Sequence, residues 1–289
     1  GTSAKFIASL EAEGIKPSLI SDFPHLRVIL STGSPLSDKS FEYVYRDWKR
    51  DVQLSSISGG TDIVSCFALG NPTLPVYCGE LQCRGLGMKV ESFNDNGVSQ
   101  IGKQGELVCS QAFPSMPIYF WNDLNGEKYH NAYFDVFENK WCHGDYILIN
   151  DVGGVQIFGR SDATLNPGGV RIGTAEIYQV VETIVGIVDS VIVGHSIGDD
   201  EEVILFVKLD KNTQLDDSLI STIRSKVKLA CSPRHVPAKI LTAPDIPYTI
   251  NGKKVEIAVK KLIHGKDVAN RDSLANPESL EFFSKCQIG

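Results

Sequence analysis

One amphipathic helix between two strands constrains the fold more than any other feature of the sequence. Four apolar residues recur at the spacing i, i+3, i+4 and i+7, which places them on one helical face. They are Phe41, Val44, Tyr45 and Trp48, in a helix that is predicted to begin near Ser37. Apolar runs predict a buried strand at 26–30 and a second strand at 52–57. This order is typical of a parallel sheet with helices on its faces.

The sequence beyond Gly79 predicts a mainly antiparallel region. Three short strands, divided by turn residues, are expected at 80–84, 88–93 and 106–110. A hairpin is expected where 146–150 and 155–158 flank a glycine-containing turn. The polar, glycine-rich segment 159–169 follows directly, and it predicts a boundary between two domains.

A small α+β domain is predicted after that boundary. Its helices are expected at 177–184, 219–227 and 255–263, and its strands at 189–194, 203–209 and 238–241. The resulting organisation is a first domain at 1–161, a small domain at 162–266 and a tail at 267–289. The tail is polar and is expected to be loosely attached.

Composition disfavours several classes of protein. The 289 residues are 42% hydrophobic and 22% charged, as in soluble globular proteins. A net charge of −7 disfavours nucleic acid as a partner, because phosphate binding needs a basic face. No apolar run approaches the roughly 18 residues of a membrane-spanning helix, so no membrane association is expected. Seven cysteines without zinc spacing predict reduced thiols in a cytosolic protein and no protein metal site.

Several short segments in a fixed order carry more information about function than any single motif. Pattern alone leaves function open, because neither a Walker phosphate loop nor a serine elbow motif is present. The segments are Ser31–Pro35, Gly60–Asp62, Gly105–Leu107, Trp141–Asp145, Gly159–Asp162, Gly168–Arg171 and Asn251–Lys253. Together they resemble the adenylate-forming family of acyl-CoA synthetases, luciferases and peptide-synthetase adenylation domains. Within that family the closer resemblance is to the acetoacetate–CoA ligases, through Ile29–Leu36, Ile57–Ile63, Gly159–Asp162, Thr164–Pro167 and Ile246–Glu256.

This resemblance implies a fold and a reaction. The fold is α/β: residues 1–161 would be the C-terminal part of a large AMP-binding domain, with a parallel sheet and a β-rich subdomain, and 162–266 its small mobile domain. The reaction is a ligation in which acetoacetate attacks the α-phosphate of ATP, giving acyl-AMP and diphosphate, and the CoA thiolate then displaces AMP. Mg²⁺ would accompany ATP. Such an activity belongs to cytosolic fatty-acid and ketone-body metabolism.

The resemblance implies that two residues take part in the chemistry. Lys253 matches a lysine that reaches the carboxylate and the α-phosphate, where it stabilises growing negative charge. Lys254 is adjacent and equally basic, but the Gly-Lys spacing favours Lys253. Thr61 matches a residue that contacts the α-phosphate and the acyl carboxylate, to which a hydroxyl can donate.

Nucleotide binding is implied for several of the same segments. Gly33 lies in a loop that follows the adenine, where a missing side chain lets the backbone approach the ring. Asp145 matches the carboxylate that accepts both ribose hydroxyls, and Arg160 a second ribose or phosphate contact. The full set is Gly33, Ser34, Pro35, Gly60, Thr61, Asp145, Arg160 and Arg171.

The resemblance also assigns residues to the second half-reaction. Asp162 matches the hinge about which the small domain turns between adenylation and thioester formation. Gly168 and Gly169 match the loop that then faces CoA. Lys228 is a further CoA candidate, although a basic residue at a helix end also complements the helix dipole.

Acid specificity is inferred from small residues before Thr61. Acetyl-CoA synthetases carry bulky aromatic side chains there, which close the pocket around a two-carbon acid. Ser58 and Gly59 occupy the corresponding acyl-pocket positions here and open space for acetoacetate. A four-carbon acid without the keto group fits the same space.

The family's phosphate-binding loop has no counterpart between Gly1 and Asp22. The chain by itself is therefore expected to be an incomplete, inactive enzyme. One alternative is a non-catalytic module that binds nucleotide or CoA. Another is an amino-acid-adenylating domain, which the short tail disfavours. The sequence leaves the oligomeric state open.

Overall fold

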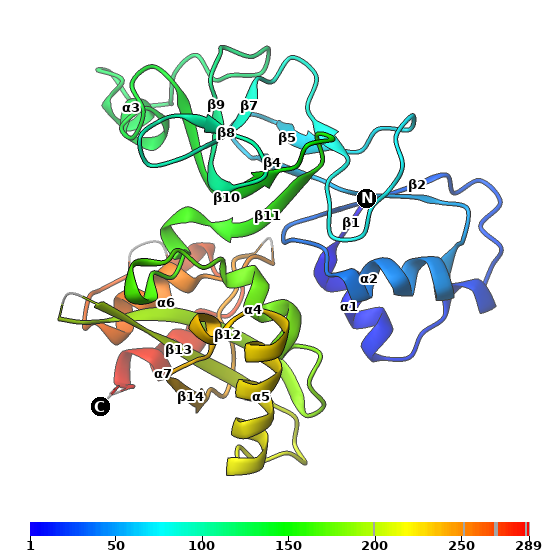
Figure 1. Ribbon diagram of the computed structural model, residues 1–289, viewed down its shortest axis with the longest axis vertical. Coiled ribbons are helices and arrows are strands. Elements are labelled where there is room, and N and C mark those ends of the chain that lie inside the picture. Colours follow the sequence, from blue (N-terminus) through cyan, green and yellow to red (C-terminus); the bar gives the residue numbers. More distant parts are fainter. Residues whose placement is uncertain (199, 251, 269–270, 287, 289) are drawn as a thin grey trace. The chain divides into compact units, whose positions relative to one another are not determined.

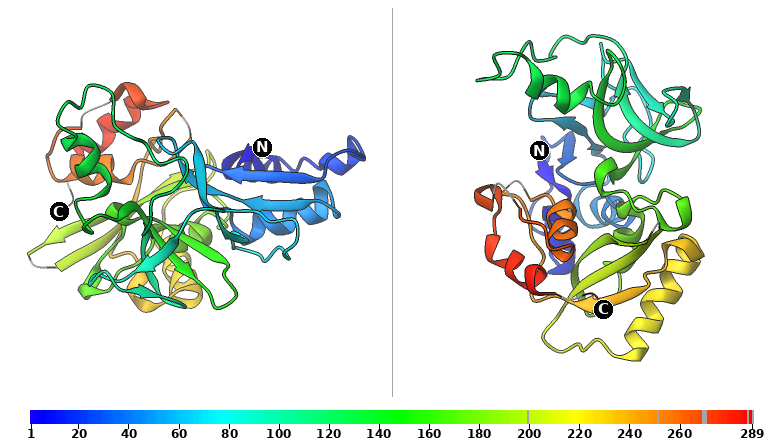
Figure 2. Two further views of the ribbon diagram at one scale, coloured as in Figure 1. Left: turned by 90° about the horizontal axis from the view of Figure 1, so that it is seen from above. Right: turned by 90° about the vertical axis from the view of Figure 1, so that its left-hand side faces the viewer.

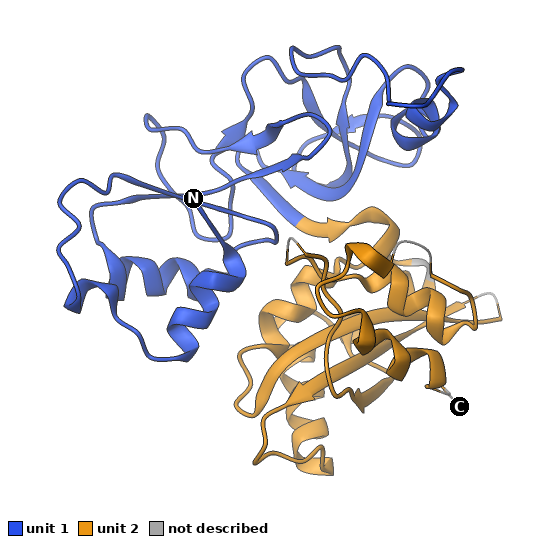
Figure 3. Ribbon diagram, turned by 180° about the vertical axis from the view of Figure 1, so that it is seen from behind, with its two compact units in different colours: residues 1–157 blue, residues 158–289 orange. Residues whose placement is uncertain are grey.

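The computed structural model describes residues 1–289 except 199, 251, 269, 270, 287 and 289. Asn251, part of one predicted motif, therefore lies outside the described residues. The chain divides into two compact units, Gly1–Ile157 and Phe158–Gly289 (Figure 3). Among the described residues, no helix is long and apolar enough to cross a lipid bilayer.

Unit 1 begins with the expected parallel sheet (Figure 1). Its strands are β1 (Thr2–Ser3), β2 (Val28–Thr32) and β3 (Gln53–Ser56), paired in that order. The helices are α1 (Ala4–Ala12), the 3₁₀ turn η1 (Pro17–Leu19), α2 (Asp38–Tyr43) and a continuation of α2 as the π-helix η2 (Val44–Trp48). Serine caps start both α-helices: the Ser3 hydroxyl accepts from Phe6 N at 3.1 Å, and the Ser37 hydroxyl from Ser40 N at 3.3 Å.

The helix face predicted at 41–48 packs on one side of this sheet. Phe41 and Val44 are buried against Ile29 and Leu54, with Tyr45 and Trp48 at the margin of the same cluster. The sequence predicts a buried strand at 26–30, but β2 is buried on one face only. Val28 and Leu30 of β2 are 43% and 40% exposed, because α1 and α2 both pack on the face that carries Ile29.

The middle of unit 1 is antiparallel, as predicted. One sheet contains β4 (Ser58–Gly60), β5 (Ser65–Leu69) and β6 (Cys83–Arg84). A second sheet has the order β11-β10-β9-β7-β8. Its strands are β7 (Val90–Phe93), β8 (Ser99–Gln100), β9 (Gln104–Cys109), β10 (Trp141–Ile149) and β11 (Val155–Arg160). Helix α3 (Glu127–Tyr133) packs Tyr129 and Tyr133 against the core around Trp141.

Unit 2 contains a three-stranded sheet between two pairs of helices. The strands are β12 (Ile187–Ile197), β13 (Asp200–Leu209) and β14 (Lys239–Thr242), with β12 antiparallel and β14 parallel to β13. The helices are α4 (Thr174–Val181), α5 (Asp217–Ala230), α6 (Glu256–Ile263) and α7 (Leu280–Lys285). Short 3₁₀ turns are η3 (Ser161–Ala163), η4 (Pro167–Gly169), η5 (Pro233–His235), η6 (Arg271–Ser273) and η7 (Pro277–Ser279).

Strand β13 explains why unit 2 has three layers. Its side chains alternate between the two faces of the sheet, and both sets are apolar. Val203, Leu205 and Val207 face α4 and α5, whereas Ile204 and Phe206 face α6 and α7. The helix pairs therefore lie on opposite sides of the sheet (Figure 2).

The expectation of a loosely attached tail is wrong. Leu280 and Phe283 of α7 are 1% and 0% exposed. The ring of Phe283 packs edge-on against Phe206, with ring centroids 5.1 Å apart. Polar residues dominate the tail, but two well-spaced apolar side chains are enough to anchor a helix of six residues.

Candidate functional site

The loop after β2 has the geometry of a strand-to-helix turn. Gly33 has φ 94°, a backbone conformation that residues with a Cβ rarely adopt. Ser34 is exposed and Pro35 half-buried, and the Ser37 cap then starts α2. The conformation at Gly33 accounts for the glycine without a ligand. It also leaves a side-chain-free backbone segment at the end of a parallel strand.

Asp145 and the β4 segment lie together in unit 1. Ser58 Oγ donates to Asp145 Oδ2 at 3.5 Å, although 87 positions separate these residues in the sequence. A bulge in β10 between Cys142 and Tyr146 interrupts the pairing with β9 at this point. Asp145 is buried, yet its side chain keeps 13% exposure.

His143 links the same residues and has no role in the sequence-based assignment. Its Nε2 lies 3.8 Å from Asp145 Oδ2. A Cβ on Gly60 would stand 2.9 Å from His143 Cε1, so glycine leaves room for the imidazole. The only available signal was its position two residues before Asp145 in one motif. Two positions along a strand share a face, although Gly144, with φ 78°, breaks the regular alternation here.

The orientation of His143 is set by its neighbours. Trp141 Nε1 donates to His143 Nδ1 at 3.4 Å. The imidazole packs against Phe67, with ring centroids 4.6 Å apart. With Nδ1 turned toward Trp141, Nε2 is the ring nitrogen that faces the Asp145 carboxylate.

Thr61 and Gly59 have different surroundings although they are close in sequence. Thr61 is exposed, and Asp62 beside it accepts a hydrogen bond from the Tyr133 hydroxyl. Gly59 pairs with β5 so closely that a Cβ would stand 1.9 Å from Ser65 O. The absence of a side chain at Gly59 thus has a cause within the sheet, independent of any acyl pocket.

The predicted residues at the start of unit 2 lie at the end of β11 and in the turn after it. Arg160 Nε is 3.6 Å from Asp162 Oδ1, and both side chains are about half exposed. Asp162 lies in the turn η3. Arg171 is exposed near the start of α4.

The glycine loop that contains Gly168 is held by the tip of the β12–β13 hairpin. Gly168 N donates to Asp200 Oδ1 at 2.8 Å, and Asn166 N donates to Glu201 Oε1 at 2.8 Å. Backbone amides, first that of Gly168, lower the pKa of Asp200 by hydrogen bonding to its carboxylate. Lys260 Nζ pairs with the other oxygen of Glu201 at 2.6 Å. Gly168 has φ 58°, which favours glycine.

Lys253 lies in a tight turn between two bridged positions, Tyr248 and Lys254. Thr249 N donates to Lys253 O at 2.8 Å, and Lys253 N donates to Thr249 Oγ1 at 3.1 Å. Gly252 adopts φ 76° between them. The Lys253 side chain is exposed, whereas that of Lys254 is only 15% exposed.

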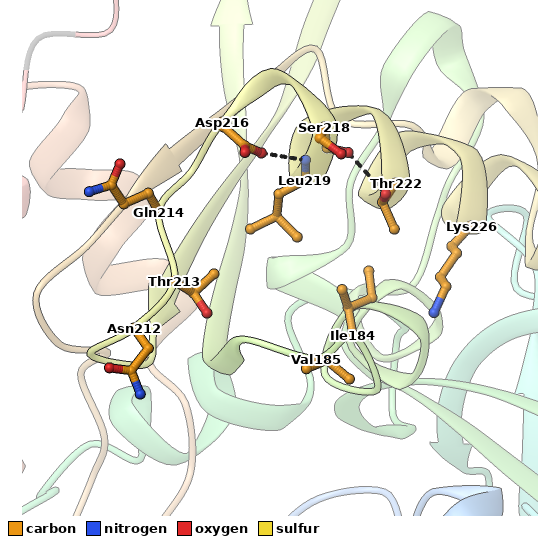
Figure 4. A pocket seen from close by; sticks show the side chains of 10 residues that line it. All are labelled: Ile184, Val185, Asn212, Thr213, Gln214, Asp216, Ser218, Leu219, Thr222 and Lys226. Carbon is orange, nitrogen blue, oxygen red and sulfur yellow. Dashed lines mark hydrogen bonds between the residues drawn. The ribbon is translucent and has the colours of Figure 1, made fainter.

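One pocket in unit 2 contains none of the predicted site residues. It has a volume of about 490 Å³ (Figure 4). Asp216, which caps α5 by accepting from Leu219 N at 2.8 Å, lies at its edge. The other lining residues are Ile184, Val185, Asn212, Thr213, Gln214, Ser218, Leu219, Thr222 and Lys226. Lys228 is exposed in the last turn of α5, a position that complements the helix dipole.

No family model matches the chain. Curated relatives include acetoacetyl-coenzyme A synthetase of Rhizobium meliloti (strain 1021), 53% identical over 98% of this chain and 44% of the relative. Acetoacetyl-CoA synthetase of Gallus gallus is 51% identical over 98% of this chain and 43% of the relative. The chain thus spans less than half the length of these relatives.

Solved structures agree with these relatives. Acetoacetyl-CoA synthetase from Streptomyces lividans aligns with a TM-score of 0.90 and 39% identity, covering 99% of this chain and 44% of that one. A benzoate CoA ligase from Burkholderia xenovorans LB400 aligns with a TM-score of 0.70 at 20% identity, over 90% of this chain and 50% of that one. The fold is therefore that of the adenylate-forming acyl-CoA ligases.

Proposed function

We propose that this chain, which is homologous to acetoacetyl-CoA synthetases over 98% of its own length, forms part of an acetoacetate–CoA ligase. The complete enzyme would join acetoacetate to CoA through an acyl-adenylate, with release of diphosphate and AMP. The observation that carries the proposal is 53% identity across both units, far more than a shared fold requires. A cytosolic place for the reaction is supported by seven cysteines that form no disulfide with one another.

The proposed nucleotide site in unit 1 centres on Asp145. Two oxygens of an ionised carboxylate suit the paired hydroxyls of a ribose. The Thr61 hydroxyl would contact the α-phosphate, and the backbone at Gly33 would contact the adenine. His143 joins this set as a positioning residue, because its Nε2 faces Asp145 at 3.8 Å.

Unit 2 supplies the remaining proposed contacts. Lys253 would neutralise charge on the carboxylate and α-phosphate during adenylation, and Arg160 and Arg171 would contact the nucleotide. The loop with Gly168 and Gly169 would face CoA, with Lys228 as a weaker candidate. A hinge at Asp162 would separate a mobile domain at 162–266, and the change of compact unit after Ile157 supports a boundary in this region.

Mg²⁺ is proposed only as a companion of ATP. Among the described residues, no group of three or more His, Cys, Asp or Glu side chains is arranged to hold a metal ion. The described part of the chain therefore offers no dedicated metal cage. Mg²⁺ usually binds through substrate phosphates and water with only one or two carboxylates.

Asp145 is expected to control ATP affinity. In a full-length chimera, this chain would be joined to the portion of the Rhizobium meliloti relative that it does not cover. Asp145→Asn in that protein should raise the KM for ATP by about 10- to 100-fold, since hydrogen bonds to a charged group contribute roughly 1.5–3 kcal/mol. Asp151→Asn, in the exposed β10–β11 turn, is the matched control. An unchanged KM for ATP in Asp145→Asn would remove the ribose assignment.

The proposed function is tested by AMP release with ATP, Mg²⁺, CoA and a panel of acetate, butyrate and acetoacetate. We expect acetoacetate-dependent AMP from the full-length chimera and none from this chain alone. Equal rates with butyrate would broaden the acid class to four-carbon acids. A chimera that folds, binds ATP and releases no AMP with any acid would contradict the ligase assignment.

A further inference from the structure

Two consecutive lysines have opposite environments at the proposed catalytic turn. Lys253 and Lys254 directly follow Gly252 of the turn, and Lys254 bridges back to Tyr248. Lys253 is exposed and Lys254 enters the interior of unit 2. The arrangement excludes Lys254 as the lysine that reaches a substrate.

Every donor of the Lys254 ammonium is used inside the protein. Nζ pairs with the Glu182 carboxylate, lies 2.9 Å from Asp189 Oδ1 and donates to Ser190 O at 2.5 Å. It also lies 4.1 Å from the centroid of the Tyr178 ring. Burial opposes the charge of Lys254, but the carboxylates of Glu182 and Asp189 outweigh it and raise its pKa. The side chain is a charged anchor.

The partners of Lys254 are themselves fixed. Tyr248 Oη donates to Asp189 Oδ2 at 2.8 Å, and Ser190 Oγ donates to Glu182 Oε1 at 3.0 Å. Tyr178 Oη accepts from Ile192 N at 3.1 Å. The network therefore joins the end of α4, strand β12 and both sides of the Thr249–Gly252 turn.

We propose that Lys254 is a positioning residue that fixes the turn carrying Lys253 and so directs the Lys253 ammonium toward the reacting groups. This inference rests on the proposed role of Lys253. The Lys253 side chain has four rotatable bonds, and ordering them for the reaction costs conformational entropy. A mobile turn would add its own backbone entropy to that cost. Tyr248 and Lys254, the two bridged residues, both bond to the partly buried Asp189, and this shared partner removes that second source of freedom.

The test measures both half-reactions in the full-length chimera. Lys254→Gln should lower kcat for acyl-AMP formation by about 10- to 100-fold, since small misplacement of a catalytic group has effects of this size. The KM for ATP and thioester formation from supplied acyl-AMP should stay within about twofold of the parent. Lys254→Arg, which keeps the charge and can pair with both carboxylates, should restore part of the rate.

The decisive comparison is made in a Lys253→Ala background. Lys254→Gln should then cause no further loss of adenylation, because a residue that acts through Lys253 has nothing left to position. If Lys254→Gln lowers adenylation in the Lys253→Ala background by the same factor as in the parent, Lys254 has a general structural role and the inference is overturned. An equal loss of thioester formation in Lys254→Gln would have the same meaning. If Lys254→Gln does not fold, Tyr248→Phe removes one hydrogen bond to Asp189 without unpairing a charge, and the same comparison applies. Full adenylation by Lys253→Ala alone would instead overturn the role of Lys253, and the inference with it.

Discussion

Replacing Lys253 with alanine in the full-length chimera should lower the rate of acyl-AMP formation by about 10²- to 10³-fold, the usual effect of removing one group that stabilises transition-state charge. Lys253 is exposed on a turn whose backbone is closed by Thr249, so alanine removes the ammonium without a buried partner to unpair. The measurement is single-turnover formation of acyl-AMP from ATP and acetoacetate. Thioester formation from supplied acyl-AMP should be unchanged, because the adenylyl group has then already been transferred from ATP to the acid and the step that needs the lysine is complete.

Lys261→Ala is the matched control for this substitution. Lys261 is also exposed in unit 2, eight positions along the chain in α6, and carries no proposed role. It should leave both half-reactions within about twofold of the parent. Equal losses of both half-reactions in Lys253→Ala would mean that the lysine serves folding or CoA binding and has no specific part in adenylation.

Phe283→Ala should reduce the free energy of unfolding of unit 2 by about 3–5 kcal/mol. The ring is fully buried between Phe206 and Phe282, and the truncated side chain would leave a cavity next to the central strand β13. Urea denaturation of the chain, followed through unit 2, measures the change. The result decides whether packing of the tail contributes to the stability of unit 2.

Phe282→Ala provides the comparison within the same helix. Phe282 is only partly buried, and its centroid lies 6.3 Å from that of Phe206. Its truncation should therefore cost clearly less than that of Phe283. Similar small losses for both variants would indicate a tail that detaches before unit 2 unfolds.

The spacing of apolar residues along the sequence predicts most of the helices and strands, because the buried faces of these elements carry apolar residues at regular intervals. Val203 to Val207 are apolar at every position, and β13 is buried on both faces. The same reasoning failed for β2, where an apolar run is covered on one side only. It also missed α7, since Leu280 and Phe283 are too few to stand out from a polar segment.

The sequence predicts candidate site residues that lie within a motif. It does not predict contacts between residues of two different motifs. The motif names Asp145, but the approach of Asp145 to Ser58 depends on a side-chain contact between β4 and β10, which lie in different sheets and 87 positions apart. No motif assigns a role to His143, because its contact with Asp145 is defined only by the fold. Spacing alone favours Lys253 over Lys254, and the ion pairs of Lys254 with Glu182 and Asp189 supply a physical reason for that preference.

The open side of β2 has a consequence for colloidal behaviour. Parallel sheets are normally covered on both faces, whereas Val28 and Leu30 here meet solvent beside a third exposed position, Thr32. An exposed apolar surface of this kind is more stable in contact with another apolar surface than in contact with water. In a concentrated preparation of this chain alone, this strand would therefore favour self-association, and the light scattered by the sample would report on it well before any unfolding.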